Sequence, residues 1–323
     1  GCDRSDAGEP RTPTGRAHTR LNFCNTFLIA APTGRLHTDT RLMHWRNLVS
    51  ADELAAQLSS AELVVVDCRF DLRDLGSGER AHAAGHIPGA VYAHLDRDLS
   101  DPGRIGRGRH PLPDADTFCA TLGRWGITPR HQVVAYDARE GVNASRLWWM
   151  LQLLGHERVA VLDGGIACWA DRGYAIETAA PRPKPAKYVA RFNVRATVST
   201  AVVAARMASG NGTLIDARAP ERFRGEIEPI DRIPGHIPGA INRHYVQNLA
   251  PDGRFKPPTV LAEEFREVLN GAPVNETLLM CGSGVTACHN LLAMEHAGLR
   301  GARVYPGSWS EWISDPLRPI ARG

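Results

Sequence analysis

The hexapeptide Gly85-His-Ile-Pro-Gly-Ala90 decides the fold, because the chain repeats it without a change as Gly235-His-Ile-Pro-Gly-Ala240. Other landmarks recur around it in the same order, and Val161-Leu-Asp-Gly164 is answered by Val304-Tyr-Pro-Gly307. Self-similarity on this scale is the signature of a repeated structural unit. The sequence therefore predicts two homologous domains in tandem.

Within each half, short runs rich in β-branched residues alternate with helical patterns such as residues 51–58, 144–154 and 286–297. Such alternation is typical of parallel strands joined by crossover helices, and the helices then cover the sheet. We expect an α/β fold with one parallel sheet in each domain and helices on both faces of each sheet. Functional groups in such sheets lie where strands end and helices begin.

The domain boundaries follow from where these patterns stop. Residues 1–42 lack regular periodicity, and we expect them to be a disordered extension. The first domain is predicted at residues 43–178 and the second at residues 191–323. Between them, residues 179–190 contain three prolines, which suppress helix and sheet hydrogen bonding and favour an extended linker.

The bulk composition excludes several classes of function. The 323 residues carry a formal net charge of +3 and 23% of them are charged, so no nucleic-acid partner is indicated. No apolar run approaches the roughly 20 residues that a membrane-spanning helix needs. Seven widely spaced cysteines without a CxxC pair argue against a disulfide framework and a structural zinc site. We expect a reduced, cytoplasmic location and neither a metal nor an organic cofactor.

One loop carries the elements of a reactive cysteine. The predicted strand at residues 277–280 runs directly into Cys281-Gly-Ser-Gly-Val-Thr286, and a helical pattern follows. A cysteine at that junction faces unpaired backbone N–H groups and the positive end of the helix dipole, which both favour the thiolate. In the first half Asp137 stands where the cysteine would be, so that domain has the scaffold without a nucleophile.

The stretch Cys281-Gly-Ser-Gly-Val-Thr-Ala-Cys288 resembles the active-site loop of the 3-mercaptopyruvate sulfurtransferases, the sister group of thiosulfate sulfurtransferase (rhodanese). The similarity runs from about residue 43 to residue 318. It includes both copies of the hexapeptide, Gly108-Arg-His-Pro-Leu-Pro113, Trp148-Trp149 and Gly307-Ser-Trp-Ser-Glu-Trp312. The resemblance implies two rhodanese-like domains with the active site in the second, at the domain interface.

The resemblance also implies a ping-pong transfer of sulfur through a persulfide on Cys281, with release of pyruvate. Ser283 then lies in the loop of the nucleophile, and the family places a histidine from the first hexapeptide, here His86, beside that serine. An upstream aspartate lies behind the histidine, for which Asp74 is the candidate and Asp71 is the alternative. Such a relay would manage the proton when the carbon–sulfur bond breaks.

For substrate binding, the family uses two arginines of the second domain. Arg222 matches the first position, and Arg232 matches the second after a shift of one residue. A planar guanidinium can hold the carboxylate of mercaptopyruvate with paired hydrogen bonds. The loop residues that are expected around the donor are Gly282, Gly284, Val285 and Thr286.

The charge of the loop predicts the sulfur donor. Rhodaneses that prefer the dianion thiosulfate resemble one another in having Arg and Lys at the second and third loop positions, where this chain has Gly282 and Ser283. Mercaptopyruvate is therefore the predicted donor and thiosulfate the alternative. The resemblance leaves thioredoxin, a small thiol and cyanide open as acceptors.

Two other functions are compatible with this fold. A Cys-dependent phosphatase needs an arginine at the end of its loop, and residues 281–290 contain none. A non-catalytic sulfur-relay or protein-binding module would fit the first domain, which has Asp137 in place of the cysteine. The retained loop around Cys281 favours the enzyme.

Overall fold

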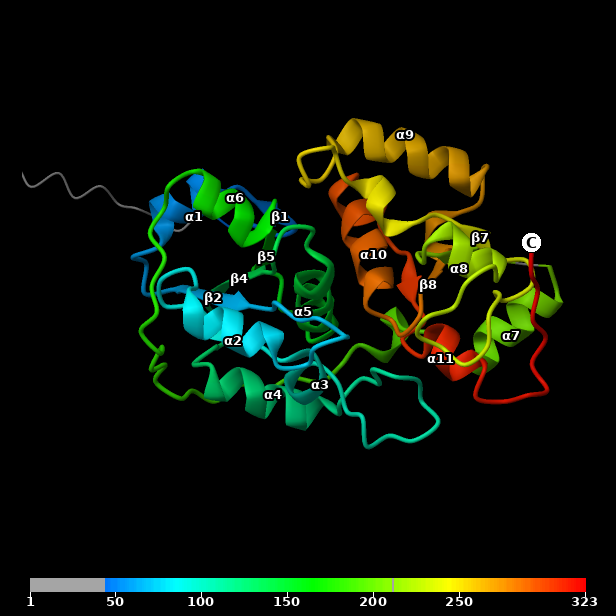
Figure 1. Cartoon of the computed structure of the whole chain (residues 1–323), viewed down its shortest axis with the longest axis horizontal. Helices are drawn as coiled ribbons and strands as arrows, with labels where there is room; N and C mark the ends of the chain where they lie inside the picture. The colour runs from blue at the N-terminus through cyan, green and yellow to red at the C-terminus, as the bar shows by residue number, and fades with distance from the viewer. Residues whose placement is uncertain (1–43, 211) are drawn as a thin grey trace, which may run out of the picture. The chain divides into compact units, whose positions relative to one another are not determined.

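Parallel strands form the centre of each repeat (Figure 1). The computed structural model describes residues 44–210 and 212–323, and the predicted extension at residues 1–42 lies outside these ranges. Within them no helix is long and apolar enough to cross a membrane.

The first sheet has five parallel strands in the order β1-β5-β4-β2-β3. Its strands are β1 (Leu48–Val49), β2 (Leu63–Asp67), β3 (Val91–Tyr92), β4 (Gln132–Tyr136) and β5 (Val159–Leu162). The helices of this half are α1 (Ala51–Gln57), α2 (Ser77–Ala84), α3 (Leu95–Asp98), α4 (Ala115–Arg124), α5 (Val142–Leu153) and α6 (Gly165–Asp171).

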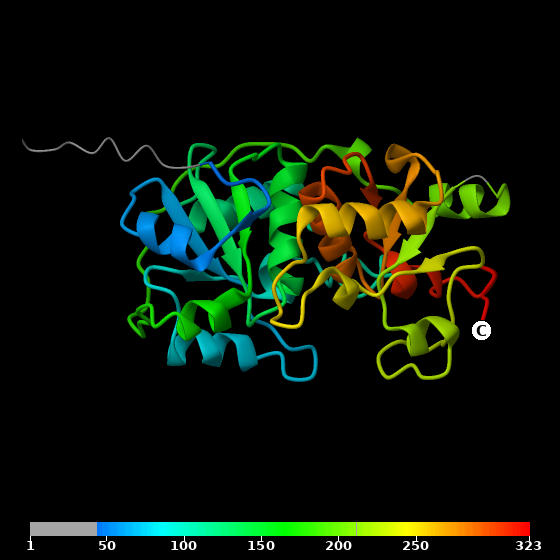
Figure 2. The ribbon, with the colours of Figure 1, turned by 90° about the horizontal axis from the view of Figure 1, so that it is seen from above.

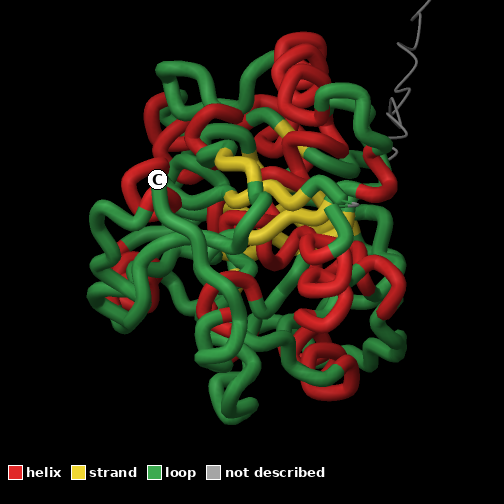
Figure 3. Tube along the Cα trace, turned by 90° about the vertical axis from the view of Figure 1, so that its right-hand side faces the viewer, coloured by secondary structure: helices red, strands yellow, loops and turns green. Residues whose placement is uncertain are grey.

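The central strand β4 is buried on both sides, because its side chains alternate between the two faces of the sheet. Val133 and Ala135 join a hydrophobic cluster with residues of α4 and α5. Val134 and Tyr136 join a second cluster with residues of α1 and α6. Helices therefore cover both faces of this sheet. In Figure 3, where the second half faces the viewer, helices drawn in red lie above and below the yellow strands.

The second sheet has four parallel strands in the order β7-β6-β8-β9. Its strands are β6 (Leu214–Asp216), β7 (Ile241–Asn242), β8 (Leu278–Met280) and β9 (Arg303–Val304). The α-helices of this half are α7 (Thr200–Ala208), α8 (Pro220–Arg224), α9 (Pro258–Leu269), α10 (Thr286–His296) and α11 (Ser308–Trp312). Short 3-10 helices lie at η1 (Val194–Ala196), η2 (Tyr245–Asn248) and η3 (Val274–Glu276). The predicted α/β fold with two tandem parallel sheets is confirmed.

Helices of the two halves pack against each other at the boundary between the halves. Helix α5 of the first half lies beside α10 of the second, as Figures 1 and 2 both show. One hydrophobic cluster includes buried residues of both helices and of both sheets. The two repeats therefore share one core.

The chain between the repeats crosses back over the first half. Residues 177–193 contain no α-helix, and the Ala186 N–H donates to the Gly123 carbonyl at 2.9 Å. A Cβ atom at Gly123 would lie 2.5 Å from the Ala186 oxygen, so only glycine allows this contact. The extended, proline-rich segment is thus fixed against the C-terminal end of α4.

The shared core predicts that the two repeats unfold together. Leu147 of α5 is fully buried in the shared cluster, so Leu147→Ala leaves a cavity and lowers the free energy of unfolding by about 2–5 kcal/mol. Guanidinium denaturation, followed by circular dichroism and tryptophan fluorescence, measures this loss. Leu317→Ala, at a side chain that is 90% exposed, is the control and changes stability by less than about 0.5 kcal/mol. Two separate transitions in the wild type would contradict a shared core.

Candidate active site

Cys281 lies at the junction between a strand and a helix. It follows the last residue of β8 directly, and α10 begins at Thr286. The Cys281 Sγ accepts a hydrogen bond from the Gly284 backbone N–H at 3.1 Å. N–H groups at the start of a helix lack partners within the helix and carry partial positive charge. This arrangement favours negative charge on the sulfur.

The loop is held in its curled form by the first turn of α11. The Trp309 N–H donates to the Cys281 carbonyl and the Ser310 N–H to the Gly282 carbonyl, both at 2.9 Å. Gly284 has a φ of +76°, and a Cβ there would lie 2.4 Å from the Pro306 oxygen. Only glycine fits both the dihedral angle and the close approach.

The sulfur is buried but reaches a cavity between the two halves. Cys281 is 2% exposed and lines a cavity of about 620 Å³. The first half contributes Arg109 and His110 to the lining, and the second contributes Arg222. Of the predicted loop residues, Gly282, Ser283, Val285 and Thr286 also line it. A small donor would therefore meet the nucleophile at the domain interface.

Ser283 contacts a histidine from the first half of the chain. Its hydroxyl lies 2.8 Å from His110 Nδ1, and both residues are buried. On the other side of the ring, His110 Nε2 lies 3.2 Å from Asp96 Oδ1, close enough for an ion pair although the contact does not meet hydrogen-bond geometry. Ser283, His110 and Asp96 thus form a row that could pass a proton from the loop.

The expectation that His86 lies beside Ser283 is wrong. His86 is fully buried, its Nδ1 contacts the His82 carbonyl at 2.7 Å, and its ring stacks on His82 with centroids 3.9 Å apart. Its backbone pairs with Glu177 instead of the loop. His86 therefore fixes the turn of its own domain.

Asp74 does not stand behind a relay histidine either. It is exposed and pairs with Arg80 at 2.5 Å, and its alternative Asp71 caps a turn by accepting from the Arg73 N–H. Both lie in a surface turn before α2, where they bridge to each other. The acidic position behind the relay histidine is occupied by Asp96 of α3.

The pKa values of the pair indicate a neutral histidine and an ionised aspartate. Burial lowers the pKa of His110, although the nearby Asp96 opposes this shift. Contact with His110 lowers the pKa of Asp96, although burial opposes it. At neutral pH the His110 ring is therefore free to accept a proton.

Two guanidinium groups flank the loop on either side of one carboxylate. Arg222 Nη2 donates to Asp231 Oδ2 at 3.0 Å, and Arg109 Nη1 donates to Asp231 Oδ1 at 2.6 Å. A Cβ on Gly282 would lie 3.2 Å from Arg109 Nη2 and 3.6 Å from Arg222 Nη2. The position of Arg222 agrees with a role in binding an anionic donor.

Arg232, the second predicted arginine, does not reach this cavity. Its guanidinium donates to the Ile313 carbonyl at the end of α11, and it does not line the cavity of Cys281. Its neighbour Asp231 faces the loop instead. Arg109, from the other domain, supplies the second guanidinium, so the expectation for Arg232 is wrong.

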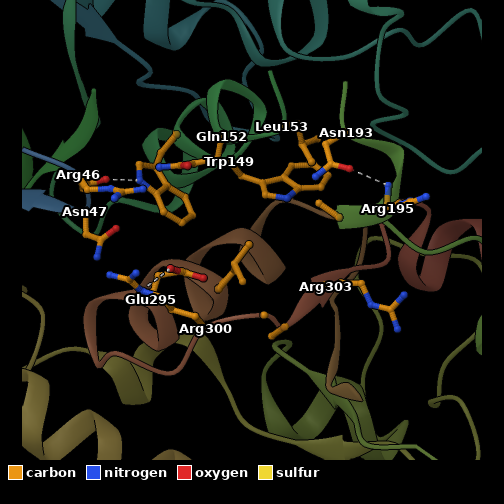
Figure 4. A pocket seen from close by; sticks show the side chains of 15 residues that line it. Arg46, Asn47, Trp149, Gln152, Leu153, Asn193, Arg195, Glu295, Arg300 and Arg303 are labelled. Carbon is orange, nitrogen blue, oxygen red and sulfur yellow. Dashed lines mark hydrogen bonds and ion pairs between the residues drawn. The ribbon is translucent and has the colours of Figure 1, made fainter. Parts of the chain in front are cut away.

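A second cavity of about 410 Å³ lies at the far ends of α5 and α10 (Figure 4). Trp149 and Leu153 line one side, and Glu295, Arg300 and Arg303 line the other. None of its lining residues is a cysteine, serine or histidine. This cavity therefore has no nucleophile, and the site around Cys281 is the candidate for chemistry.

Comparison with known proteins agrees with this geometry. The rhodanese-like domain family matches residues 50–172 and 199–315, so the fold and the cysteine loop define a rhodanese-type sulfurtransferase. Such an enzyme takes sulfur from a small-molecule donor and passes it to an acceptor. The Pseudomonas aeruginosa "Probable 3-mercaptopyruvate sulfurtransferase" is 47% identical, with 85% of this chain and 98% of the relative covered. The chain belongs to the two-domain rhodanese family of the 3-mercaptopyruvate sulfurtransferases.

Two further relatives bear on the donor. SseB of Mycobacterium tuberculosis, named as a candidate thiosulfate sulfurtransferase, is 40% identical over 85% of this chain and 97% of its own length. The crystal structure of SseA from Escherichia coli, described with the 3-mercaptopyruvate sulfurtransferases, is 31% identical. It superposes with a TM-score of 0.72 and covers 82% of this chain and 100% of SseA.

Sequence reasoning missed His110, Asp96 and Arg109. His110 and Arg109 lie within Gly108-Arg-His-Pro-Leu-Pro113, a motif that carries the family resemblance but follows no strand. Without a strand or helix to place them, nothing in the pattern directs these side chains toward a loop 173 residues away. An isolated histidine in a motif shared with the family is the signal that could have identified them.

The row predicts different results for two aspartates. Asp96→Asn keeps the side-chain shape but removes the charge behind His110, so we expect kcat to fall about 100-fold. Removal of a neighbouring anion disfavours the imidazolium, so the acid limb of the pH profile moves to lower pH. Steady-state assays of sulfur transfer from pH 5 to pH 9 measure both effects. Asp74→Asn is the matched control and leaves kcat unchanged; a comparable loss in both variants would contradict the row.

Proposed function

We propose that the protein transfers sulfur from 3-mercaptopyruvate to a thiol through a persulfide on Cys281. The observation that carries the proposal is the Cys281 Sγ, which accepts the Gly284 N–H and opens to a cavity between the halves. Ser283, His110, Arg109 and Arg222 also line this cavity, and the Ser283 hydroxyl contacts His110. A nucleophile, a proton carrier and an anion-binding group therefore surround one small volume.

In the first half-reaction, the thiolate of Cys281 attacks the sulfur of mercaptopyruvate. The S–S bond forms as the C–S bond breaks, and the electron pair of the broken bond leaves on C3 as the enolate of pyruvate. The proton of the donor thiol is taken up, and C3 receives one proton to give pyruvate. The row of Ser283, His110 and Asp96 supports a role in moving this proton, since the neutral His110 ring can accept it.

In the second half-reaction, an acceptor thiolate attacks the outer sulfur of the persulfide and Cys281 leaves as a thiolate. No net oxidation occurs, because the sulfane sulfur passes from one sulfur atom to another. A small thiol, thioredoxin and cyanide are all chemically competent acceptors. The cavity of about 620 Å³ admits a small thiol or cyanide directly.

The charge around the loop supports a monoanionic donor. Arg222 donates to Glu228 at 2.7 Å as well as to Asp231, so much of its charge is already balanced. Arg109 is balanced by Asp231. A carboxylate can take over one of these contacts, whereas a second negative charge would meet Asp231 without a free cation. Thiosulfate stays the alternative donor, favoured by the name of the SseB relative.

Intact-mass analysis tests the reaction and the nucleophile together. After incubation with mercaptopyruvate, the wild type gains the mass of about one sulfur atom, as expected for a covalent persulfide. Cys281→Ser gains none, because the hydroxyl is not a sulfur nucleophile. Cys288→Ser is the control and keeps the gain. Labelling of Cys288 instead of Cys281 would contradict the assignment.

The donor assignment is tested with three arginines. Arg222→Gln and Arg109→Gln each lower kcat/KM for mercaptopyruvate about 10- to 100-fold, the size of a lost hydrogen bond to a charged group. Arg232→Gln, one residue from Asp231 but bonded to Ile313, is the matched control and leaves kcat/KM unchanged. We expect mercaptopyruvate to exceed thiosulfate in kcat/KM for the wild type. Equal efficiency with thiosulfate would move the assignment to the alternative.

A further inference from the structure

Arg146 is a buried cation in the half that lacks a nucleophile. It lies on α5, its side chain is 0% exposed, and it forms hydrogen bonds to carbonyl groups but no ion pair with a carboxylate of residues 44–210 and 212–323. Burying a charge without an opposite charge is unfavourable unless strong compensating interactions exist. The surroundings of Arg146 must therefore supply that compensation.

The guanidinium of Arg146 joins the two parts of the candidate site. Nη1 donates to the Gly284 carbonyl of the cysteine loop at 3.1 Å. Nη2 donates to the His110 carbonyl at 3.1 Å and to the Leu99 carbonyl at 3.3 Å. One planar group therefore holds the loop of the nucleophile and the segment of the relay histidine at a fixed separation.

Gly284 lies between this cation and the reactive sulfur. Its N–H donates to Cys281 Sγ at 3.1 Å, and its carbonyl accepts from Arg146. The N–H and the carbonyl of one residue belong to different peptide groups, so the positive charge of Arg146 acts on the sulfur through space. Trp149, which lines the cavity in Figure 4, has its ring centroid 5.1 Å from the Arg146 Cζ.

Two thiols lie near Arg146, and only one is suited to be its anionic partner. Burial lowers the pKa of Arg146, and the charges of Cys288 and Cys281 oppose that shift. Burial raises the pKa of Cys288 to about 12, so this thiol stays protonated and donates to the Gly284 carbonyl at 3.2 Å. Cys281, whose Sγ accepts the Gly284 N–H, is therefore the thiol whose position suits a counter-charge to Arg146.

We propose that Arg146 is a positioning residue that supplies the counter-charge for the Cys281 thiolate and persulfide and holds His110 in register with Ser283. The proposal rests on the function proposed above, and it assigns to the first domain a role in the chemistry of the second. The domain without a cysteine is then part of the active site and more than a packing partner.

The charge role is tested by alkylation, which needs no sulfur donor. Arg146→Met removes the charge and keeps a side chain of similar length. We expect iodoacetamide to modify Cys281 about tenfold more slowly at pH 7, because loss of a nearby cation moves thiolate formation up by about one pH unit or more. The rate is measured against pH from the peptide that carries Cys281, so other cysteines do not contribute.

The geometric role is tested by Arg146→Lys, which keeps the charge but not the planar fork. We expect its alkylation midpoint to stay within about half a pH unit of the wild type, since the charge is retained. Its kcat falls because one ammonium group cannot hold the carbonyls of Gly284, His110 and Leu99 together. A midpoint in Arg146→Lys that rises by a full pH unit would overturn the charge role, even if Arg146→Met does not fold.

Arg243 provides the matched control. It is also a buried arginine, 2% exposed, but it bonds Asn248 and Glu264 and does not line the cavity of Cys281. Arg243→Met lowers the thermal midpoint and leaves the alkylation profile of Cys281 unchanged. An equal shift in both Met variants, or a folded Arg146→Met with the wild-type profile, overturns the proposal. Failure of the wild type to form a persulfide would instead count against the proposed function.

Discussion

A hydrogen-bond acceptor at the junction of a strand with a helix is the constraint on which both halves depend. In the first half, Asp137 follows β4 and its carboxylate accepts the N–H groups of Gly141 and Asn143 at 2.9 Å. In the second half, Cys281 follows β8 at the equivalent place and accepts the Gly284 N–H. The repeated loop directs backbone N–H groups at one side-chain acceptor in each domain. One copy holds a fixed carboxylate, and the other holds a sulfur that can change its bonding.

The two halves therefore contribute different residues to the candidate site. The second half carries the proposed nucleophile Cys281, and the first half brings His110, Asp96, Arg109 and Arg146 to the candidate site from segments around its own core. These contacts survive only if the halves keep their relative position. The shared cluster between α5 and α10 provides that, because α5 carries Arg146 and α10 begins at the cysteine loop. The packing of α5 against α10 therefore also aligns the residues of the candidate site.

The tandem fold could be predicted from the sequence, because it depends on local patterns. The proposal of Cys281 as the nucleophile rests on a local pattern of the same kind. The repeated hexapeptide gives the tandem fold, and a glycine-rich run between a strand and a helix gives Cys281. The relay could not be predicted, because it depends on a contact between distant segments. The repeated motif itself indicates a structural role for His86, because its counterpart His236 makes the same kind of contacts. His236 bonds the carbonyl and stacks on the ring of Phe223, and His86 bonds the carbonyl and stacks on the ring of His82. A histidine with the same local contacts in both copies stabilises the turn of its own domain.

The charge pattern of the cavity explains how a buried site can bind an anion without excess positive charge. Arg109 and Arg222 both form ion pairs with Asp231, and Arg222 and Arg218 both form ion pairs with Glu228. Such pairs are stable without a ligand, since no cation is left desolvated alone. The Arg109 Nε is buried and has no hydrogen-bond partner within the described part of the chain, so one donor near the loop is unused. A carboxylate that enters would compete with Asp231 for the guanidinium groups of Arg109 and Arg222. Binding strength then depends on how well the ligand replaces Asp231 as the partner of these two guanidinium groups.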